Sequence, residues 1–137
     1  MPNIRPLEKK DFAKVAKLFP QLINEPVKFN GDELIADQNA NCIVIENDGI
    51  LAGFGSLITY RVPTKGLVAR IEDVIVNESC RGRGYGKLLT QELIKIARDK
   101  DIHEINLTSG PQREAARGLY ESMGFKLINT GIFHLNL

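Results

Sequence analysis

The fold is decided by residues 67–87, which read LVARIEDVIVNESCRGRGYGK. The first part, Leu67–Val76, is rich in β-branched residues and predicts a long strand. Three alternating glycines follow at Gly82, Gly84 and Gly86, and apolar side chains then recur at helical spacing. The stretch therefore predicts a strand, a glycine-rich turn and a helix in immediate succession.

The glycine turn has the properties of an anion site. Glycine reaches positive φ and lacks the Cβ that would keep a ligand away from the backbone. The first amides of the following helix have no internal partner, and the helix dipole adds positive charge there. Arg81, Arg83 and Lys87 place three cations around the turn, which would suit a pyrophosphate. The alternative is a structural turn with solvated arginines. The Gly-x-Gly-x-Gly spacing of this turn differs from that of a Walker loop and from that of a dinucleotide fingerprint.

The rest of the chain predicts an α/β (α+β) fold, with a mixed, mostly antiparallel central sheet flanked by helices. Hydrophobic periodicity and turn residues predict the elements. The expected strands are Asn3–Leu7, Cys42–Glu46, Leu51–Val62, Leu67–Val76, Ile102–Thr108, Phe125–Asn129 and Gly131–Leu137. The expected helices are Phe12–Leu22, Tyr85–Lys100 and Arg113–Met123, with a short helix allowed in the polar loop Pro26–Asn41. Gly53 and Gly55 are candidate bulge points.

Composition narrows the functional classes. The 137 residues fit a single domain, 1–137, with 43% hydrophobic and 26% charged residues. A net charge of +1 argues against a nucleic-acid partner. No apolar run reaches the ~20 residues of a membrane span, and the N-terminus lacks signal-peptide features. Cys42 and Cys80 have no metal-like spacing, so we expect free thiols, no metal and a cytoplasmic location.

Two motifs resemble the GNAT superfamily of N-acetyltransferases. The coenzyme motif, Arg/Gln-x-x-Gly-x-Gly/Ala, is matched by Arg81–Gly86, and the Leu-Tyr-x-x-x-Gly-Phe signature is matched by Leu119–Phe125. Residues 71–89 are also similar to the corresponding part of glucosamine-6-phosphate N-acetyltransferases. This local similarity is not enough to assign the same substrate to this chain. One position departs from the pattern: Arg113 stands where many members carry a coenzyme-contacting asparagine.

The resemblance implies an acyltransferase that moves the acetyl group of acetyl-CoA directly to a primary amine through a tetrahedral intermediate. The pantetheine arm would pair with the main chain of the strand before the turn, at Val74 and Val76 with Ile75 between them. The amide near Val74 would stabilise the oxyanion. The implied coenzyme contacts in the turn are Arg81, Gly82, Arg83, Gly84, Tyr85, Gly86 and Lys87. Arg113 would reach a phosphate instead of making the asparagine contact.

Two residues are candidates for catalytic roles, and the resemblance assigns one of these roles to Tyr120. Glu72 is the first candidate for the base that deprotonates the acceptor ammonium, and Asp73 is the reserve. Strand alternation puts these two side chains on opposite faces unless a bulge intervenes. Glu72 could instead simply pair with Arg70. Tyr120 would protonate the leaving thiolate, or would otherwise be a packing aromatic.

Three other functions are weighed against this one. A non-catalytic coenzyme A-binding regulatory module would bind the coenzyme without acyl transfer. A nucleotide-binding domain would use the turn for ATP or NAD, and a structural protein would bind no small ligand. The acceptor is open: a small-molecule or peptide amine, with an acidic loop around Pro20–Ala40 that would suit a cation. Dimers are frequent among similar proteins, which is compatible with a homodimer.

Overall fold

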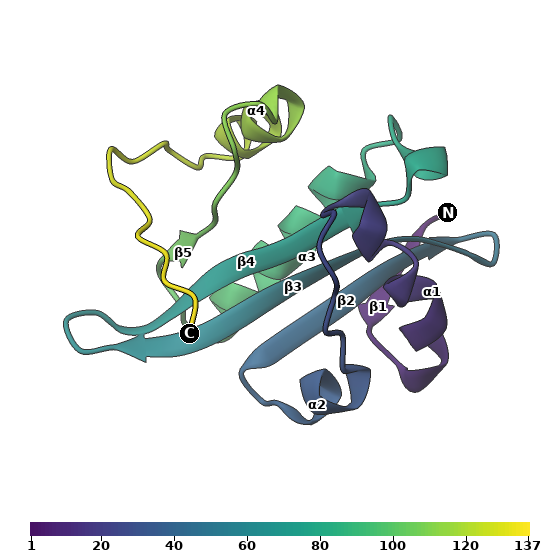
Figure 1. Ribbon diagram of the computed structural model, residues 1–137, viewed down its shortest axis with the longest axis horizontal. Coiled ribbons are helices and arrows are strands. Elements are labelled where there is room, and N and C mark those ends of the chain that lie inside the picture. Colours follow the sequence, from purple (N-terminus) through teal and green to yellow (C-terminus); the bar gives the residue numbers. More distant parts are fainter. The chain divides into compact units, whose positions relative to one another are not determined.

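The computed structural model describes residues 1–137, which form two compact units, 1–107 and 108–137. The first unit contains one five-stranded sheet in the order β1-β2-β3-β4-β5 (Figure 1). The strands are β1 (Asn3–Pro6), β2 (Ala40–Asn47), β3 (Ile50–Val62), β4 (Gly66–Val76) and β5 (Ile105–Asn106). All neighbours are antiparallel except β4 and β5, which are parallel. The predicted mixed, mostly antiparallel α/β sheet is confirmed.

The helices are α1 (Phe12–Ala16), α2 (Gly31–Ala36), α3 (Tyr85–Asp99) and α4 (Glu114–Ser122). The helix predicted over 12–22 is interrupted: α1 ends at Ala16, and a separate 3-10 turn covers Phe19–Gln21 with Pro20 as its second residue. Proline has no N–H to continue a helical hydrogen-bond ladder. None of the helices is long and apolar enough to cross a membrane.

The two faces of the sheet are covered differently. On one face, α3 packs closely against β3 because two glycines leave room for it. A Cβ on Gly53 would lie 3.1 Å from Leu89 Cδ1 and 2.8 Å from the Ile75 carbonyl, and a Cβ on Gly55 would lie 3.3 Å from Leu93 Cδ1. The register irregularities of β3 fall beside these same glycines. The sheet and α3 are thereby closely packed along β3.

The other face carries an aromatic core. The rings of Phe19 and Phe54 meet edge to face with centroids 5.7 Å apart, and Phe19 lies 5.2 Å from Phe29. Buried apolar residues surround them, including Leu7, which follows β1, and the fully buried Val15 of α1 and Val44 of β2. This cluster attaches the segment 12–36 to the sheet, where it can form a wall over β3 and β4.

The strand β5 is shorter than expected. Only Ile105 and Asn106 pair with β4, opposite Ala69 and Arg70, whereas a strand is predicted over 102–108. Within residues 1–107, the far half of β4 consequently has one edge without a neighbouring strand.

The second unit is built on α4. Gly124 adopts φ +99° after the helix, and the Phe125 amide donates to the Tyr120 carbonyl at 3.0 Å, so the helix ends as the glycine predicts. The strands predicted over 125–129 and 131–137 are wrong, because these residues form no strand. Large apolar side chains there are exposed, among them Leu127 at 75% and Phe133 at 101%. An alternating pattern specifies a strand's two faces but supplies no pairing partner.

A buried ion-pair network joins β1 to the turn before α1. The Arg5 guanidinium donates to both carboxylate oxygens of Asp11, at 2.7 and 2.9 Å, and its Nε donates to Glu46 on β2 at 3.0 Å. Asp11 is 3% exposed. The hydrogen bonds from Arg5 hold the pKa of Asp11 below its usual value.

Replacing Asp11 with Asn should lower the free energy of unfolding by about 3 kcal/mol at pH 7. This value is at the lower end of the range for breaking a buried ion pair, because Arg5 retains its ion pair with Glu46. Because the folded pKa of Asp11 is depressed, its contribution is complete above the unfolded pKa of about 3.9. It is lost as the pH falls through the folded value. Urea titrations at several pH values should therefore show the wild type and the variant converging below about pH 4.

The matched control is Asp99→Asn, which breaks the exposed Lys95–Asp99 pair. That variant should change stability by less than ~1 kcal/mol. An equal loss in both variants, or a pH-independent difference for Asp11→Asn, would contradict the assignment.

Candidate active site

A β-bulge in β4 organises the site. The register with β3 shifts between Phe54 and Ser56, so that four residues of β4, Glu72 to Ile75, face three of β3. Asp73 takes up the extra length in the left-handed region at φ +53°. Plain alternation would send Glu72 and Asp73 to opposite faces, but both line the same cavity. The bulge therefore places two carboxylates on one wall.

The bulge also determines which main-chain groups face the open edge. Before it, the Ala69 amide donates to the Glu104 carbonyl before β5 at 3.2 Å, so Ala69 and Ile71 face away from β3. After it, the Asn77 amide donates to the Ala52 carbonyl of β3 at 2.7 Å. Alternation then turns Val74 and Val76 toward the edge where β5 no longer pairs. For these same two residues the family resemblance implies main-chain pairing with a pantetheine arm.

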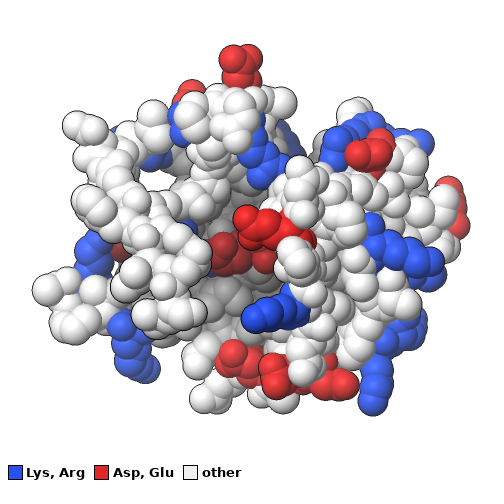
Figure 2. All heavy atoms as spheres, in the orientation of Figure 1, with Lys and Arg blue, Asp and Glu red and all other residues white.

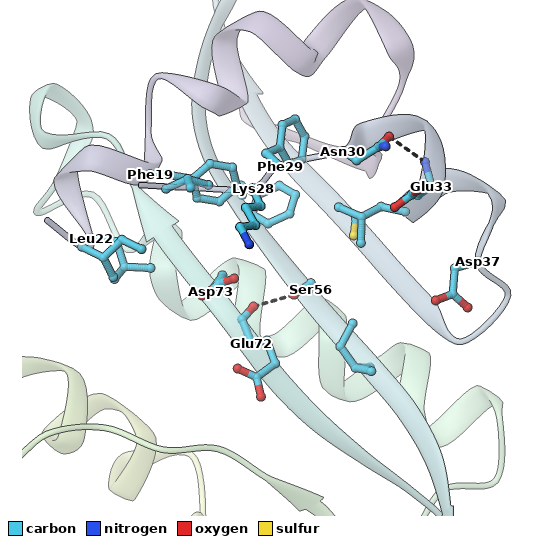
Figure 3. Close-up of a pocket in the computed structure, with 16 residues that line it drawn as sticks. Phe19, Leu22, Lys28, Phe29, Asn30, Glu33, Asp37, Ser56, Glu72 and Asp73 are labelled. Carbon is cyan, nitrogen blue, oxygen red and sulfur yellow. Dashed lines mark hydrogen bonds between the residues drawn. The ribbon is translucent and has the colours of Figure 1, made fainter. Parts of the chain in front are cut away.

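The cavity next to the bulge has a volume of about 540 Å³, which is ample for a small ligand. One wall is β4 with its neighbour β3, and the other wall is the segment that carries Phe19, Phe29 and α2 (Figure 3). The apolar lining consists of Phe19, Leu22, Ile23, Val27, Phe29, Leu34, Phe54 and Ile58. Four carboxylates line it as well, Glu33, Asp37, Glu72 and Asp73, together with one cation, Lys28.

The two carboxylates of the bulge differ in their surroundings. Glu72 forms an ion pair with Arg70 on the same strand, with Arg70 Nε 3.0 Å from its Oε1. Its main-chain carbonyl accepts from Ser56 Oγ at 2.6 Å, which fixes the backbone at the bulge. Asp73 forms no ion pair, and partial burial together with the Glu72 charge raises its pKa. Asp73 is thus the carboxylate whose basicity is increased.

Cys42 is a further member of the cavity wall and is half-buried. Burial, with smaller effects from Asp37 and Asp73, raises its thiol pKa to about 11. The thiol is therefore protonated near neutral pH and is a poor nucleophile there. Nothing in the residue environment suits a covalent acyl-cysteine step.

The glycine turn follows β4 and a 3-10 turn over Glu78–Cys80. Gly82 and Gly84 have φ of +82° and +80°, and no atom lies within 4 Å of where a Cβ would stand on either residue. Arg81 Nε donates to the Val76 carbonyl at 3.3 Å, which connects the turn to the open edge. Arg83 and Lys87 are exposed. Figure 2 shows basic side chains over this turn and acidic ones over α2 and the middle of β4.

Two predicted coenzyme residues are placed where their side chains serve packing. Tyr85 is 6% exposed, and its hydroxyl accepts from Asn47 Nδ2 at 2.9 Å. Any coenzyme contact of Tyr85 would therefore use its main chain. Ile75 is 3% exposed, and its main chain faces β3 by the alternation described above. Asn47, at the end of β2, connects the β2–β3 turn to Tyr85, the first residue of α3, and no sequence pattern predicts this contact.

The remaining predicted residues belong to the second unit. Tyr120 lies in α4 and packs edge to face on Phe125, with ring centroids 5.8 Å apart. Burial raises the pKa of Tyr120, although the Arg113 charge opposes the shift, so the phenol is protonated at neutral pH and can donate. Arg113 precedes the first turn of α4 and is exposed. In the chain as a whole, no group of three or more His, Cys, Asp or Glu side chains could hold a metal ion.

Comparison with known proteins agrees with this architecture. The sequence model of the acetyltransferase (GNAT) family matches residues 4–125, and the chain therefore belongs to that family of N-acetyltransferases. A glucosamine 6-phosphate N-acetyltransferase of Trypanosoma brucei brucei is 32% identical over 134 residues, which cover 90% of this chain and 88% of the relative.

Solved structures give the same result. A crystal structure of a Trypanosoma brucei acetyltransferase is 31% identical and superposes with a TM-score of 0.82 over the full length of both chains. The aminoglycoside N-acetyltransferase AAC(6')-Iy, solved in complex with CoA, is 20% identical with a TM-score of 0.87 over 99% of this chain and 95% of its own. At that identity the likeness concerns the fold.

The environment of Cys42 gives a reactivity prediction. In a Cys80→Ala background, alkylation of Cys42 by iodoacetamide at pH 8 should be about 100-fold slower in the folded protein than in urea, because little thiolate is present. The rate in the folded protein should keep rising towards pH 11, provided that the fold persists there by circular dichroism. A plateau near pH 8.5 would contradict the burial of this thiol.

Proposed function

We propose that the protein transfers the acetyl group of acetyl-CoA to a primary amine that binds in the cavity beside β4. The observation that carries the proposal is the bulge at Asp73. It combines, on one strand, an open edge at Val74 and Val76 and a carboxylate-lined cavity, and a glycine-rich turn with basic side chains follows. Membership of the acetyltransferase family supports the same reaction class.

The chain offers suitable groups for each part of the coenzyme. The main-chain groups of Val74 and Val76 face the unpaired edge and would bind the pantetheine amides by strand addition. The turn from Arg81 to Lys87 would hold the pyrophosphate, since its glycines leave open space and the N-terminus of α3 follows at once. Arg113 would supply a further cation for a phosphate.

The acceptor side requires a base, because an alkylamine with a pKa near ~10.4 arrives as an ammonium ion. Asp73 now takes precedence over Glu72 in this role. Its pKa is raised, it has no ion-pair partner and it lines the cavity, whereas Glu72 is held by Arg70. Loss of the proton to Asp73, directly or through a water, frees the nitrogen lone pair for attack on the acetyl carbonyl.

Transfer forms a C–N bond and breaks the C–S bond. The Val74 amide, directed to the open edge, would donate to the carbonyl oxygen as negative charge develops there. The leaving thiolate needs one proton, which Tyr120 would supply from its phenol. The nitrogen, positively charged after attack, loses its second proton as the C–S bond breaks. That proton would restore the Tyr120 phenol through solvent, while Asp73 releases the first proton to solvent. The high pKa of Cys42 favours this direct transfer over an acyl-enzyme.

Both compact units would serve one catalytic domain, because the family match at residues 4–125 runs across their boundary at residue 107. We propose a cytoplasmic protein on the basis of its free cysteines, and a homodimer is compatible with the resemblance.

Coenzyme binding can be tested with a pair of glycine variants. Gly84→Val and Gly66→Val impose comparable strain, since both glycines have positive φ, +80° and +75°, and open space around the Cβ position. Acetyl-CoA at about 100 times its dissociation constant should stabilise the wild type and Gly66→Val by ~2.7 kcal/mol, roughly 4 °C or more in thermal unfolding. Gly84→Val should lose that shift.

ATP and NAD⁺ run in parallel are the comparison ligands. Stabilisation by ATP or NAD⁺ instead of acetyl-CoA, or none by any of them, would refute the coenzyme assignment. Stabilisation by acetyl-CoA without acetylation of any amine would indicate a non-catalytic coenzyme-binding module.

The base assignment predicts an unequal effect of two neighbouring substitutions. Asp73→Asn should lower kcat by about 100-fold or more, and Glu72→Gln by clearly less, because only Asp73 combines raised basicity with freedom from an ion pair. In the wild type, kcat/KM should rise with pH as the Asp73 carboxyl ionises above its usual range. Coenzyme-induced stabilisation in both variants is the control for folding. A larger loss in Glu72→Gln would return the role to Glu72.

The same assay tests the proton donor. Tyr120→Phe should lower kcat by about 10-fold or more while acetyl-CoA still stabilises the protein. Unchanged turnover on the preferred acceptor would remove Tyr120 from the mechanism.

A further inference from the structure

The charge of the acceptor cavity is asymmetric. Among the four carboxylates that line it, only Glu72 is in an ion pair, which leaves Glu33, Asp37 and Asp73 without one. Asp73 belongs to the β4 wall, while Glu33 and Asp37 belong to the α2 wall (Figure 3). The single cation, Lys28, is exposed and forms no ion pair with any of them. Carboxylates thus stand on both sides of the space, with apolar side chains as its remaining lining.

From this distribution we infer that the acceptor is an alkyl di- or polyamine: a reacting amine, an apolar spacer and a second ammonium group. This inference rests on the proposed function and specifies its substrate class. The reacting amine would lie at Asp73, and the distal ammonium would meet Glu33 and Asp37. The methylene spacer would contact apolar lining residues such as Phe29, which precedes α2, and Leu34, which lies in α2.

The α2 wall of the cavity is unsuited to a phosphorylated acceptor, although the relative from Trypanosoma brucei brucei is a glucosamine 6-phosphate N-acetyltransferase. Phosphate sites usually present several arginine or lysine donors, or free amides at a helix N-terminus. Here the first turn of α2 carries Asp32 and Glu33, and the Asn30 side chain already accepts from the Glu33 amide at 3.1 Å. A phosphate dianion would therefore meet carboxylates and one lysine.

The experiment compares matched acceptors in an assay of coenzyme A release. Cadaverine and pentylamine have the same chain length and differ by one ammonium group, and glucosamine 6-phosphate is the third acceptor. We expect kcat/KM for cadaverine to exceed that for pentylamine by about fivefold or more, since exposed carboxylates attract a cation only modestly. Turnover of glucosamine 6-phosphate should be lower than that of cadaverine.

The double variant Glu33→Gln, Asp37→Asn should abolish the preference for cadaverine by raising its KM, with pentylamine unaffected. Asp32→Asn is the control, because Asp32 is exposed, neighbours Glu33 on α2 and does not line the cavity. It should keep the preference. Stabilisation by cadaverine in thermal unfolding, in the presence of coenzyme A, should disappear in the double variant alone, which provides a reading independent of turnover.

Equal use of cadaverine and pentylamine, or a preference for glucosamine 6-phosphate, would overturn the inference while leaving an active acetyltransferase. If acetyl-CoA neither binds nor donates to any amine, the proposed function itself fails. In that case the binding of cadaverine decides the inference: loss of its stabilising effect in the double variant supports a diamine site, and absence of the effect in the wild type refutes it.

Discussion

One extra residue in β4 is the constraint on which the rest of the site depends. The bulge at Asp73 reverses the alternation of the strand, so that Val74 and Val76 present their main chain to the open edge while Glu72 and Asp73 share one cavity. Without it, a regular strand would separate the two carboxylates and turn the odd-numbered residues to that edge. The conformational energy of Asp73 at φ +53° is offset by the hydrogen bonds between β3 and β4 on both sides of the bulge.

The pairing of β3 with β4 is itself supported by close packing. Gly53 and Gly55 allow α3 to approach the sheet. The fully buried Leu89 and Leu93 of α3 occupy the space that a Cβ atom on either glycine would need. The same helix begins at the glycine turn, so the contact that stabilises β3 also fixes where the first amides of α3 lie. Tyr85 strengthens the arrangement through Asn47. Stability and ligand geometry consequently depend on one interface.

Charge divides the first unit in a way that fits two different ligands. Basic side chains gather at the turn after β4, which suits an anion, and unpaired carboxylates gather in the cavity on the α2 side, which suits a cation (Figure 2). Because the basic and acidic side chains nearly cancel, the net charge of the chain is only +1 and does not reveal this separation. A two-substrate reaction between an anionic donor and a cationic acceptor is consistent with such a division, because each ligand meets charge of the opposite sign.

The sequence by itself determined the order of the elements up to residue 124 and the glycine-rich turn before α3, because these follow from local periodicity and from glycine's access to positive φ. It also placed both candidate carboxylates on one strand. Only the tertiary structure decided that Asp73, and not Glu72, is the carboxylate without an ion pair, since that depends on a bulge and on the Arg70 pair. The segment 125–137 shows the limit most clearly: its alternation encodes strand faces, but pairing requires a partner that local sequence does not supply.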